Sequence, residues 1–242
     1  MPEFGPRALG ISYDFGKIFP DSLLAKLHIV NIHFSLLPQY RGAIPVEMAI
    51  INGDKTTGIT FQWTDKEMDA GDILLTKEVA IKKEWTSGEL QNHMDSLIPE
   101  MLQGLLSEQD FTRWPQKKQV GEPTFCFKKD LKRENAILRF DELTAEEVVR
   151  RVKAFNPEPL AWTPITFQEK EATMNILNAE VFEQLTPSTV KLSANEVSWV
   201  KKRGMVIGTR GGEVLVTELV ISAKKPLKNG DIVSLKDKVA IV

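Results

Sequence analysis

The feature that most constrains the fold is a short apolar segment, Leu27–Val30, that runs directly into the polar residues Asn31 and His33. Its β-branched, apolar character predicts a buried strand. Because side chains alternate along a strand, Asn31 and His33 lie on one face while Ile32 packs on the other. Loop-forming residues follow at 35–42. Ligands bind at the carboxyl ends of strands in open α/β sheets, so the amide and the imidazole are predicted to lie at a ligand site.

An amide and an imidazole at a strand end suit acyl-transfer chemistry. The amide can donate to a developing oxyanion, and a histidine with a near-neutral pKa can donate or accept a proton. The triplet alone more often marks a strand cap beside a packed, half-buried histidine, because three-residue patterns are common. However, Asp69 follows a second strand-like run, Gly58–Trp63, in the turn-rich segment 68–73. Asp69 would orient His33 or accept a proton, which predicts an Asn/His/Asp constellation.

These motifs resemble the signature of the folate-dependent formyltransferases. The matching segments are Asn31-x-His33-x-Ser35-Leu36-Leu37-Pro38, Tyr40-Arg41-Gly42, Asn52-Gly53-Asp54 and Asp69-Ala70-Gly71-Asp72-Ile73. A later segment, Lys153–Pro159, resembles the start of the C-terminal domain in members that act on methionyl-tRNA. The resemblance implies transfer of a formyl group from 10-formyltetrahydrofolate to the amino group of initiator methionyl-tRNA, a step of translation initiation. A nucleotide-linked amino sugar is the alternative acceptor, because the same three residues would serve both.

The resemblance also assigns roles to particular residues. Asn31 would donate to the oxyanion, His33 would move protons, and Asp69 would hold His33 in its working tautomer and help to remove the proton of the amine. The loop of Ser35, Leu36, Leu37 and Pro38 would line the folate site. Two roles stay open for Arg41, which either positions a phosphate of the acceptor or braces this loop.

The predicted fold class is α/β, with two domains. Residues 1–116 are predicted to form a Rossmann-like formyltransferase domain, and the polar segment 117–141 is predicted to be a linker. Residues 142–242 are predicted to form a helix and a small open β-barrel, OB-like and of the tRNA-binding type. Strands are expected at 163–167, 174–177, 189–192, 205–208, 213–221 and 232–235, and helices at 45–51, 86–105 and 144–155. The basic run Lys201-Lys202-Arg203 is either a tRNA-facing surface or an ordinary charged rim.

The start of the chain departs from the family pattern. Family members have several strand–helix units before the position of Gly10, so the sheet is expected to be shortened at its N-terminal side. The strand at 11–13 would then have an unpaired edge. The chain is accordingly expected to be a fragment, half of a split protein or a reduced family member. It would be a monomer unless a partner supplies the missing part, and a non-catalytic partner subunit is a further alternative.

Composition restricts the remaining possibilities. With 42% hydrophobic residues, 26% charged residues and a net charge of −2 over 242 residues, the chain has no global basic signature for nucleic acid. The single cysteine, Cys126, excludes an internal disulfide and fits a reducing cytosol. No run approaches the roughly 18–20 apolar residues of a membrane span. We therefore expect a cytoplasmic protein without a membrane segment, and no metal site, since no cysteine–histidine cluster has zinc spacing.

Overall fold

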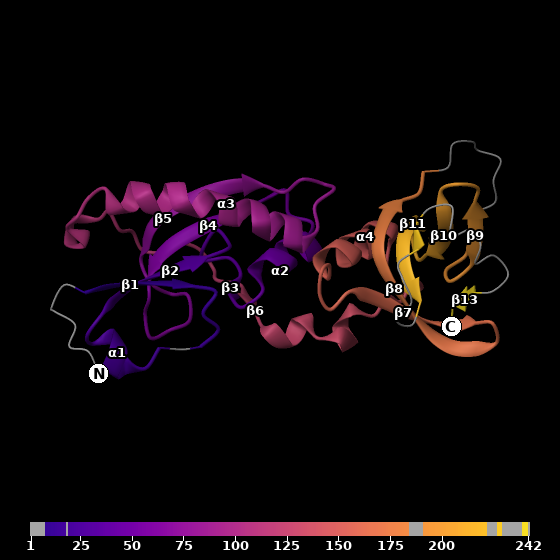
Figure 1. The fold of residues 1–242 in the computed structure, drawn as a ribbon, viewed down its shortest axis with the longest axis horizontal. Helices are drawn as coiled ribbons and strands as arrows, with labels where there is room; N and C mark the ends of the chain where they lie inside the picture. The colour runs from indigo at the N-terminus through magenta and orange to yellow at the C-terminus, as the bar shows by residue number, and fades with distance from the viewer. Residues whose placement is uncertain (1–7, 18, 184–190, 222–226, 229–238, 242) are drawn as a thin grey trace. The chain divides into compact units, whose positions relative to one another are not determined.

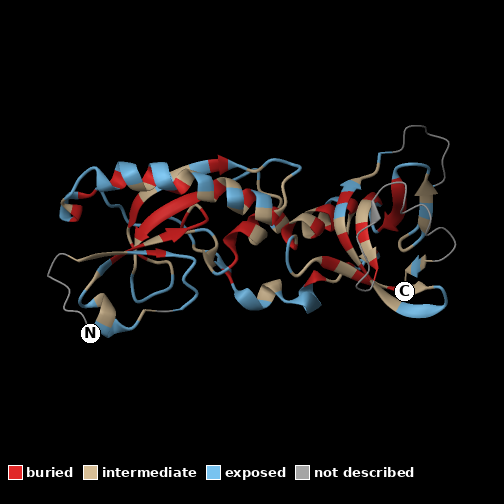
Figure 2. Cartoon of the chain, in the orientation of Figure 1, coloured by how far each residue is buried: buried red, intermediate tan, exposed pale blue. Residues whose placement is uncertain are grey.

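The computed structural model describes residues 8–17, 19–183, 191–221, 227–228 and 239–241 (Figure 1). The chain divides into two compact units, Met1–Asp130 and Leu131–Val242. Each unit has its own sheet and its own buried apolar core (Figure 2). No helix among the described residues is long and apolar enough to cross a membrane.

The first unit is built on a four-stranded sheet in the order β1-β2-β4-β5. Its strands are β1 (Leu9–Tyr13), β2 (His28–His33), β4 (Thr56–Trp63) and β5 (Ile73–Ala80). β1 and β2 are parallel, whereas β4 is antiparallel to both of its neighbours. A second, two-stranded sheet joins β3 (Arg41–Gly42) in parallel to β6 (Phe125–Cys126). The predicted α/β class is therefore present in this unit.

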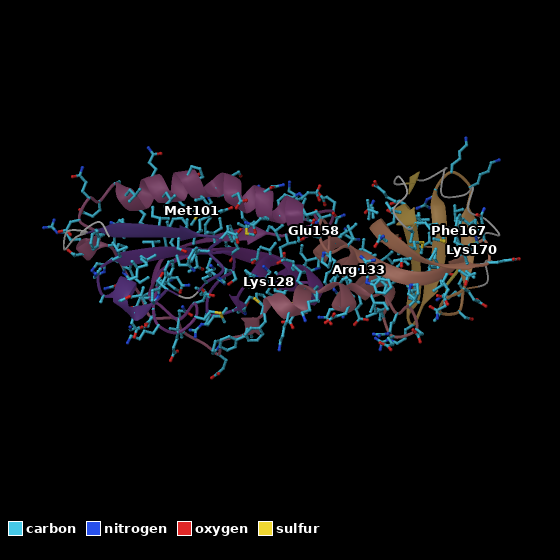
Figure 3. All side chains as sticks on the ribbon, turned by 60° about the horizontal axis from the view of Figure 1, so that its bottom comes forward. Met101, Lys128, Arg133, Glu158, Phe167 and Lys170 are labelled. Atoms are coloured by element: carbon cyan, nitrogen blue, oxygen red, sulfur yellow. The ribbon has the colours of Figure 1, made fainter. Side chains whose placement is uncertain are left out.

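The helices of the first unit are α1 (Asp21–Leu24), α2 (Pro45–Asn52) and α3 (Ser87–Leu106), with a 3₁₀ helix, η1, at Phe111–Arg113. α2 begins with a proline and ends at Gly53, whose φ of 76° suits a left-handed cap. α3 begins with a reciprocal capping box between Thr86 and Glu89. Its buried stripe, which includes Met101 (labelled in Figure 3), confirms the helix predicted from the spacing of apolar residues.

One detail of this sheet differs from the expectation, and another adds to it. The sequence indicates two short strands at 73–75 and 78–81, but β5 runs without interruption from Ile73 to Ala80, because it pairs with β4 from Ala80 to Leu75 and, after one register shift, at Ile73. β1 lies at one end of the sheet order, and its residues Ile11 and Tyr13 are each 47% exposed. In the described residues the outer edge of β1 therefore carries apolar side chains that water reaches.

In its described residues, the second unit is a curled antiparallel sheet with one α-helix, α4 (Ala145–Ala154). The strand order is β13-β7-β8-β11-β10-β9, and β12 pairs with β11. The strands are β7 (Ala161–Phe167), β8 (Lys170–Val181), β9 (Val197–Val200), β10 (Gly204–Thr209), β11 (Gly212–Ile221), β12 (Leu227–Lys228) and β13 (Val239–Ile241). α4 packs against β8 and β11, and a Thr144–Glu147 capping box begins it at the predicted residue.

Some strand predictions in the second unit fail or fall outside the described residues. Lys191 and Leu192, predicted as part of a strand at 189–192, are irregular, because the N–H of Leu192 donates to the Glu213 side chain and not to a strand. Residues 189–190 and the strand predicted at 232–235 lie outside the described residues. β9 was not predicted.

The segment predicted as a linker, residues 117–141, has contacts in both units. Lys117 exchanges two backbone hydrogen bonds with Ile73, and β6 pairs with β3 in the first unit. Two 3₁₀ helices follow, η2 (Lys128–Leu131) and η3 (Arg133–Ala136), and Ile137 forms a bridge with Trp162 in the second unit. The functional boundaries at 116 and 142 stay a prediction.

Candidate functional site

The structure brings Asn31, His33 and Asp69 together on one face of the first sheet. Asn31 and His33 lie near the end of β2, and Asp69 lies in the loop between β4 and β5 with a φ of 51°. The Nδ2 atom of Asn31 donates to Oδ1 of Asp69 at 3.1 Å. The Nδ1 atom of His33 lies 3.6 Å from Oδ2 of Asp69, slightly beyond hydrogen-bond distance. Asp69 thus contacts both residues of the predicted pair.

The carboxylate of Asp69 accepts further hydrogen bonds from groups that the sequence did not identify. Its Oδ1 also accepts from Nε2 of the buried Gln62 at 2.9 Å, and its Oδ2 accepts from the backbone N–H of Gly42 at 2.8 Å. Gln62 reaches this carboxylate because it pairs with Asn31 across β2 and β4. Only knowledge of that antiparallel register would have identified Gln62 as a member of the site.

The imidazole of His33 is buried, with 5% of its surface exposed. Burial lowers its pKa below the ordinary 6.5, while the charge of Asp69 and a hydrogen bond to Tyr40 act in the opposite direction. The Nε2 atom lies 2.9 Å from the carbonyl oxygen of Tyr40. A carbonyl only accepts, so this hydrogen bond places the proton on Nε2. In the neutral ring, Nδ1 then carries a lone pair on the side of Asp69.

Tyr40 therefore supplies the group that orients His33, a role that the sequence did not suggest. Its φ of 56° turns the carbonyl toward the imidazole. Its hydroxyl donates to Oδ2 of Asp54 at 2.6 Å and accepts from Nδ2 of Asn52 at 2.9 Å. Burial, together with the hydrogen bond to Asp54, raises the pKa of Tyr40 to about 12. The phenol thus stays protonated at neutral pH and remains a donor to Asp54.

Arg41 braces the loop that carries Asp69. Its Nε and Nη2 atoms donate to Oε1 of Gln119 at 3.1 and 2.7 Å. Nε2 of Gln119 in turn donates to the backbone carbonyls of Asp69 and Gly71 at 2.8 and 2.9 Å. The sequence left open whether Arg41 positions an acceptor phosphate or braces the loop of residues 35–38. The observed hydrogen bonds brace the Asp69 loop instead, and both of those roles stay predictions.

In the loop predicted to line the folate site, two side chains are buried and two are partly exposed. Ser35 and Leu37 are buried, and the hydroxyl of Ser35 donates to the carbonyl of Gln39 within the loop. Leu36 and Pro38 are partly exposed, and the peptide bond before Pro38 is cis. Leu36 and Pro38 are thus the members of the predicted set whose side chains a ligand can reach.

A further polar side chain lies beside this site. Ser12 pairs in register with Asn31 on the other side of β2, so the two side chains share a face. The hydroxyl of Ser12 is buried and has no hydrogen-bond partner among the described residues. Among the described residues, no group of three or more histidine, cysteine, aspartate or glutamate side chains is placed to hold a metal ion.

The remaining predicted contacts lie in the second unit. Lys201, Lys202 and Arg203 form the exposed turn between β9 and β10, and Arg203 pairs with Glu180 at 2.9 Å. Cys126, in the first unit, is buried, and burial raises the pKa of its thiol to about 11. Its thiol is therefore protonated at neutral pH and suits packing.

Two sequence families match this chain, and together they cover most of it. Residues 9–106 match the family described as formyl transferase, and residues 130–235 match the formyl transferase C-terminal domain. The chain belongs to the formyl transferase family. The resemblance inferred from the sequence is thereby confirmed, as is the predicted fold of a Rossmann-like domain followed by a curled, open-barrel domain.

Within this family, the chain resembles methionyl-tRNA formyltransferases. It is 34% identical to the methionyl-tRNA formyltransferase of Pelotomaculum thermopropionicum over 96% of this chain and 71% of that protein. It is 32% identical to that of Clostridium tetani over 88% of this chain and 66% of the relative. The chain thus spans about two thirds of the length of these relatives.

Solved structures show the same fold. HypX from Aquifex aeolicus in complex with tetrahydrofolic acid aligns with a TM-score of 0.69 and 22% identity, over 95% of this chain and 39% of HypX. A sugar N-formyltransferase from Shewanella sp. FDAARGOS_354 aligns with a TM-score of 0.57 and 27% identity, over 64% of this chain and 63% of that chain.

Proposed function

We propose that this chain transfers the formyl group of 10-formyltetrahydrofolate to the α-amino group of methionyl-tRNA, in the cytoplasmic initiation of translation. The observation that carries the proposal is the Asn31–Asp69–His33 cluster at the end of β2. The relatives that are 32–34% identical and carry the name methionyl-tRNA formyltransferase support the choice of acceptor. Because the chain spans about two thirds of the length of those relatives, the whole activity, with its donor and its acceptor, is part of the proposal.

In this mechanism Asn31 stabilises the negative charge that forms on the formyl oxygen. The neutral amine of the acceptor attacks the formyl carbon, a new C–N bond forms, and the carbonyl oxygen becomes an oxyanion. Nδ2 of Asn31 has two protons, and its bond to Asp69 uses one of them. That bond fixes the plane of the amide and leaves the second N–H to donate to the oxyanion.

His33 and Asp69 handle the proton that the attacking amine must lose. Nδ1 of neutral His33 carries the lone pair that accepts this proton, because Tyr40 holds the other ring nitrogen. The resulting imidazolium would face the carboxylate of Asp69, 3.6 Å away, which stabilises the charge. As the bond from the formyl carbon to N10 of the folate breaks, the proton passes to N10. The products are the formylated amine and tetrahydrofolate.

The folate would contact the two partly exposed side chains of the loop that follows β2. Leu36 and Pro38 present partly exposed apolar side chains to a ring system, while Ser35 and Leu37 hold the loop from within. The complex of HypX with tetrahydrofolic acid, a structure of the same fold, is consistent with a folate in this chain. We assign to Lys201, Lys202 and Arg203 the role of contacts with tRNA phosphates.

A nucleotide-linked amino sugar is the second candidate acceptor. The 27% identity with a sugar N-formyltransferase favours it, and the three proposed catalytic residues would act in the same way on an amino sugar. The presence of a matched C-terminal domain at residues 130–235, together with the higher identity to methionyl-tRNA formyltransferases, favours tRNA.

The test offers both acceptors to the purified full chain with labelled 10-formyltetrahydrofolate. We expect label in methionyl-tRNA and not in a dTDP-linked amino sugar, and we expect His33→Ala to abolish the transfer. Label in the amino sugar alone would establish the second candidate. Absence of transfer to either acceptor by a folded chain would refute the proposal that this chain is active by itself, and the expectation of a monomer would be tested next by adding a partner.

A further inference from the structure

Two exposed phenylalanine rings stand parallel to one another in the first unit. The rings of Phe125 and Phe127 are 50% and 44% exposed, their centroids are 6.4 Å apart, and the angle between their planes is only 5°. Large apolar side chains are costly to leave in water, so a matched, parallel and exposed pair indicates a surface that binds something. The parallel arrangement points to a flat ligand.

Phe125 lies in β6 and Phe127 follows that strand directly, so the spacing of the two rings is close to that of alternate strand residues. Alternate residues of a strand point to the same side, and two residues rise about 6.6 Å. Cys126, between the two phenylalanines, is buried on the opposite side. A planar ring inserted between two others needs about 7 Å, that is, two contacts of about 3.5 Å. The ring centroids are 6.4 Å apart, about 0.6 Å less than this, so a ligand ring enters when the exposed side chains rotate to face one another across it.

The backbone under the two rings is held in place. β6 pairs with β3, where Arg41 is opposite Phe125 and Gly42 is opposite Cys126. The N–H of Phe127 donates to Oδ2 of Asp130 at 3.0 Å, and the N–H of Asp130 donates back to the carbonyl of Phe127 at 2.8 Å. A site whose backbone is already fixed loses little conformational entropy when a ligand binds.

The charges next to the rings favour an anionic ligand. Nζ of Lys129 lies 5.4 Å from the centroid of the Phe127 ring, and Lys128 is exposed at the start of η2 (Figure 3). Asp130 is the acidic residue of this turn, and its carboxylate accepts the N–H of Phe127. Aromatic rings that stack on bases, beside cations that contact phosphates, are the means by which proteins bind single-stranded nucleic acid.

We propose that Phe125 and Phe127 form an aromatic clamp for one unpaired base of a single-stranded nucleic acid, whose adjacent phosphate contacts Lys128 and Lys129. This inference rests on the proposed function, under which the strand is the unpaired 3′ end of methionyl-tRNA. The clamp is connected to the candidate site through the backbone, since Gly42, which pairs with Cys126, donates its N–H to Asp69. A base held by the clamp would therefore be anchored to the same strand pair that positions the proposed catalytic carboxylate.

The first experiment uses the full chain and a short single-stranded RNA that carries 2-aminopurine, whose fluorescence is quenched when it stacks on an aromatic ring. We expect quenching on binding. Phe125→Leu and Phe127→Leu keep apolar bulk but remove the stacking face, and each should weaken binding by about tenfold or more. Phe127→Tyr keeps a stacking face and should bind the RNA with the affinity of the unsubstituted chain. Phe15→Leu alters another exposed ring, stacked on Phe19, and should leave the affinity unchanged.

A second measurement guards against variants that fail to fold. In Lys128→Gln, the dependence of binding on salt should decrease by a slope of about 0.7, as expected for one lost phosphate contact on a single strand. Quenching that persists in folded Phe125→Leu and Phe127→Leu variants would overturn the clamp. The clamp would also be overturned if the two leucine variants bound RNA normally but no longer self-associated, because the rings would then bind a second copy of the protein.

Clamp and proposed function can fail separately. Quenching that requires both rings, in a chain that forms no formyl-methionyl-tRNA, would support the clamp and refute the function. Normal formyl transfer in the two leucine variants, with an unchanged KM for methionyl-tRNA, would support the function and overturn the clamp.

Discussion

The substitution Asp69→Asn tests the central carboxylate with almost no change of shape. The carboxylate accepts hydrogen bonds from Asn31, Gln62 and the N–H of Gly42, and it faces Nδ1 of His33. An amide has one oxygen that accepts and one NH₂ group that does not. In one orientation the new amide nitrogen faces Asn31 and Gln62. In the other it faces the N–H of Gly42.

The second orientation costs less, because it leaves only one donor without an acceptor. Loss of a hydrogen bond to a charged group costs about 1.5–3 kcal/mol, so we expect the free energy of unfolding to fall by about that amount. In this orientation the new amide donates toward Nδ1 of His33 and occupies the lone pair that must accept the proton. The imidazolium would also lose its anionic partner. We therefore expect kcat to fall by about 10²–10⁴-fold.

Asp72→Asn is the matched control, since Asp72 lies in the same loop and its carboxylate contacts the exposed Lys118 at 2.9 Å. An ion pair whose lysine is this exposed contributes little to stability. Urea unfolding and steady-state formyl transfer would be measured for both variants at the same pH. If Asp69→Asn were as active as Asp72→Asn, or unfolded at the same urea concentration, the reasoning would be refuted.

Three further substitutions test other parts of the structure by urea unfolding. Burial lowers the pKa of His33 below 6.5, so between these values the unfolded state binds more protons and stability falls as pH decreases below about 6.5. His33→Gln should reduce that slope by up to about 1.4 kcal/mol per pH unit, and an unchanged slope would contradict the assignment. Gly42→Ala should cost more than about 3 kcal/mol, because φ is 121° and a Cβ would collide with the carbonyl of Cys126. Its control, Gly104→Ala in α3, has an open surrounding and should stabilise by about 0.5–1 kcal/mol. Ser12→Ala should leave stability unchanged or raise it by about 1 kcal/mol, whereas a loss of that size would show that the hydroxyl has a partner.

Local rules were sufficient for the parts of the site that one strand determines. The alternation of side chains predicted that Asn31 and His33 share a face, and the helices predicted at 86–105 and 144–155 are present as α3 and α4. Gln62 was not predicted as a member of the site, because its position beside Asn31 depends on the register between β2 and β4. Register is set by the packing of the whole sheet and not by either strand alone.

Loop conformation limited the prediction in a second way. The carbonyl of Tyr40 faces His33 because Tyr40 adopts a positive φ, which side chains other than glycine rarely do. The sequence gives no direct sign of such a conformation at a tyrosine. The bracing of Asp69 by Gln119 was likewise not predictable, since the contact joins residues 50 positions apart.

The most direct test of the central claim is a single-turnover measurement. The full chain, in excess over methionyl-tRNA and saturated with 10-formyltetrahydrofolate, is mixed rapidly, and formyl-methionyl-tRNA is counted over time for the natural sequence and for Asn31→Ala. We expect one formyl group per methionyl-tRNA and a rate constant reduced by about 10²–10³-fold in the variant, as for loss of one oxyanion donor. Equal rate constants for the two proteins would contradict the proposed role of the cluster around Asn31, His33 and Asp69.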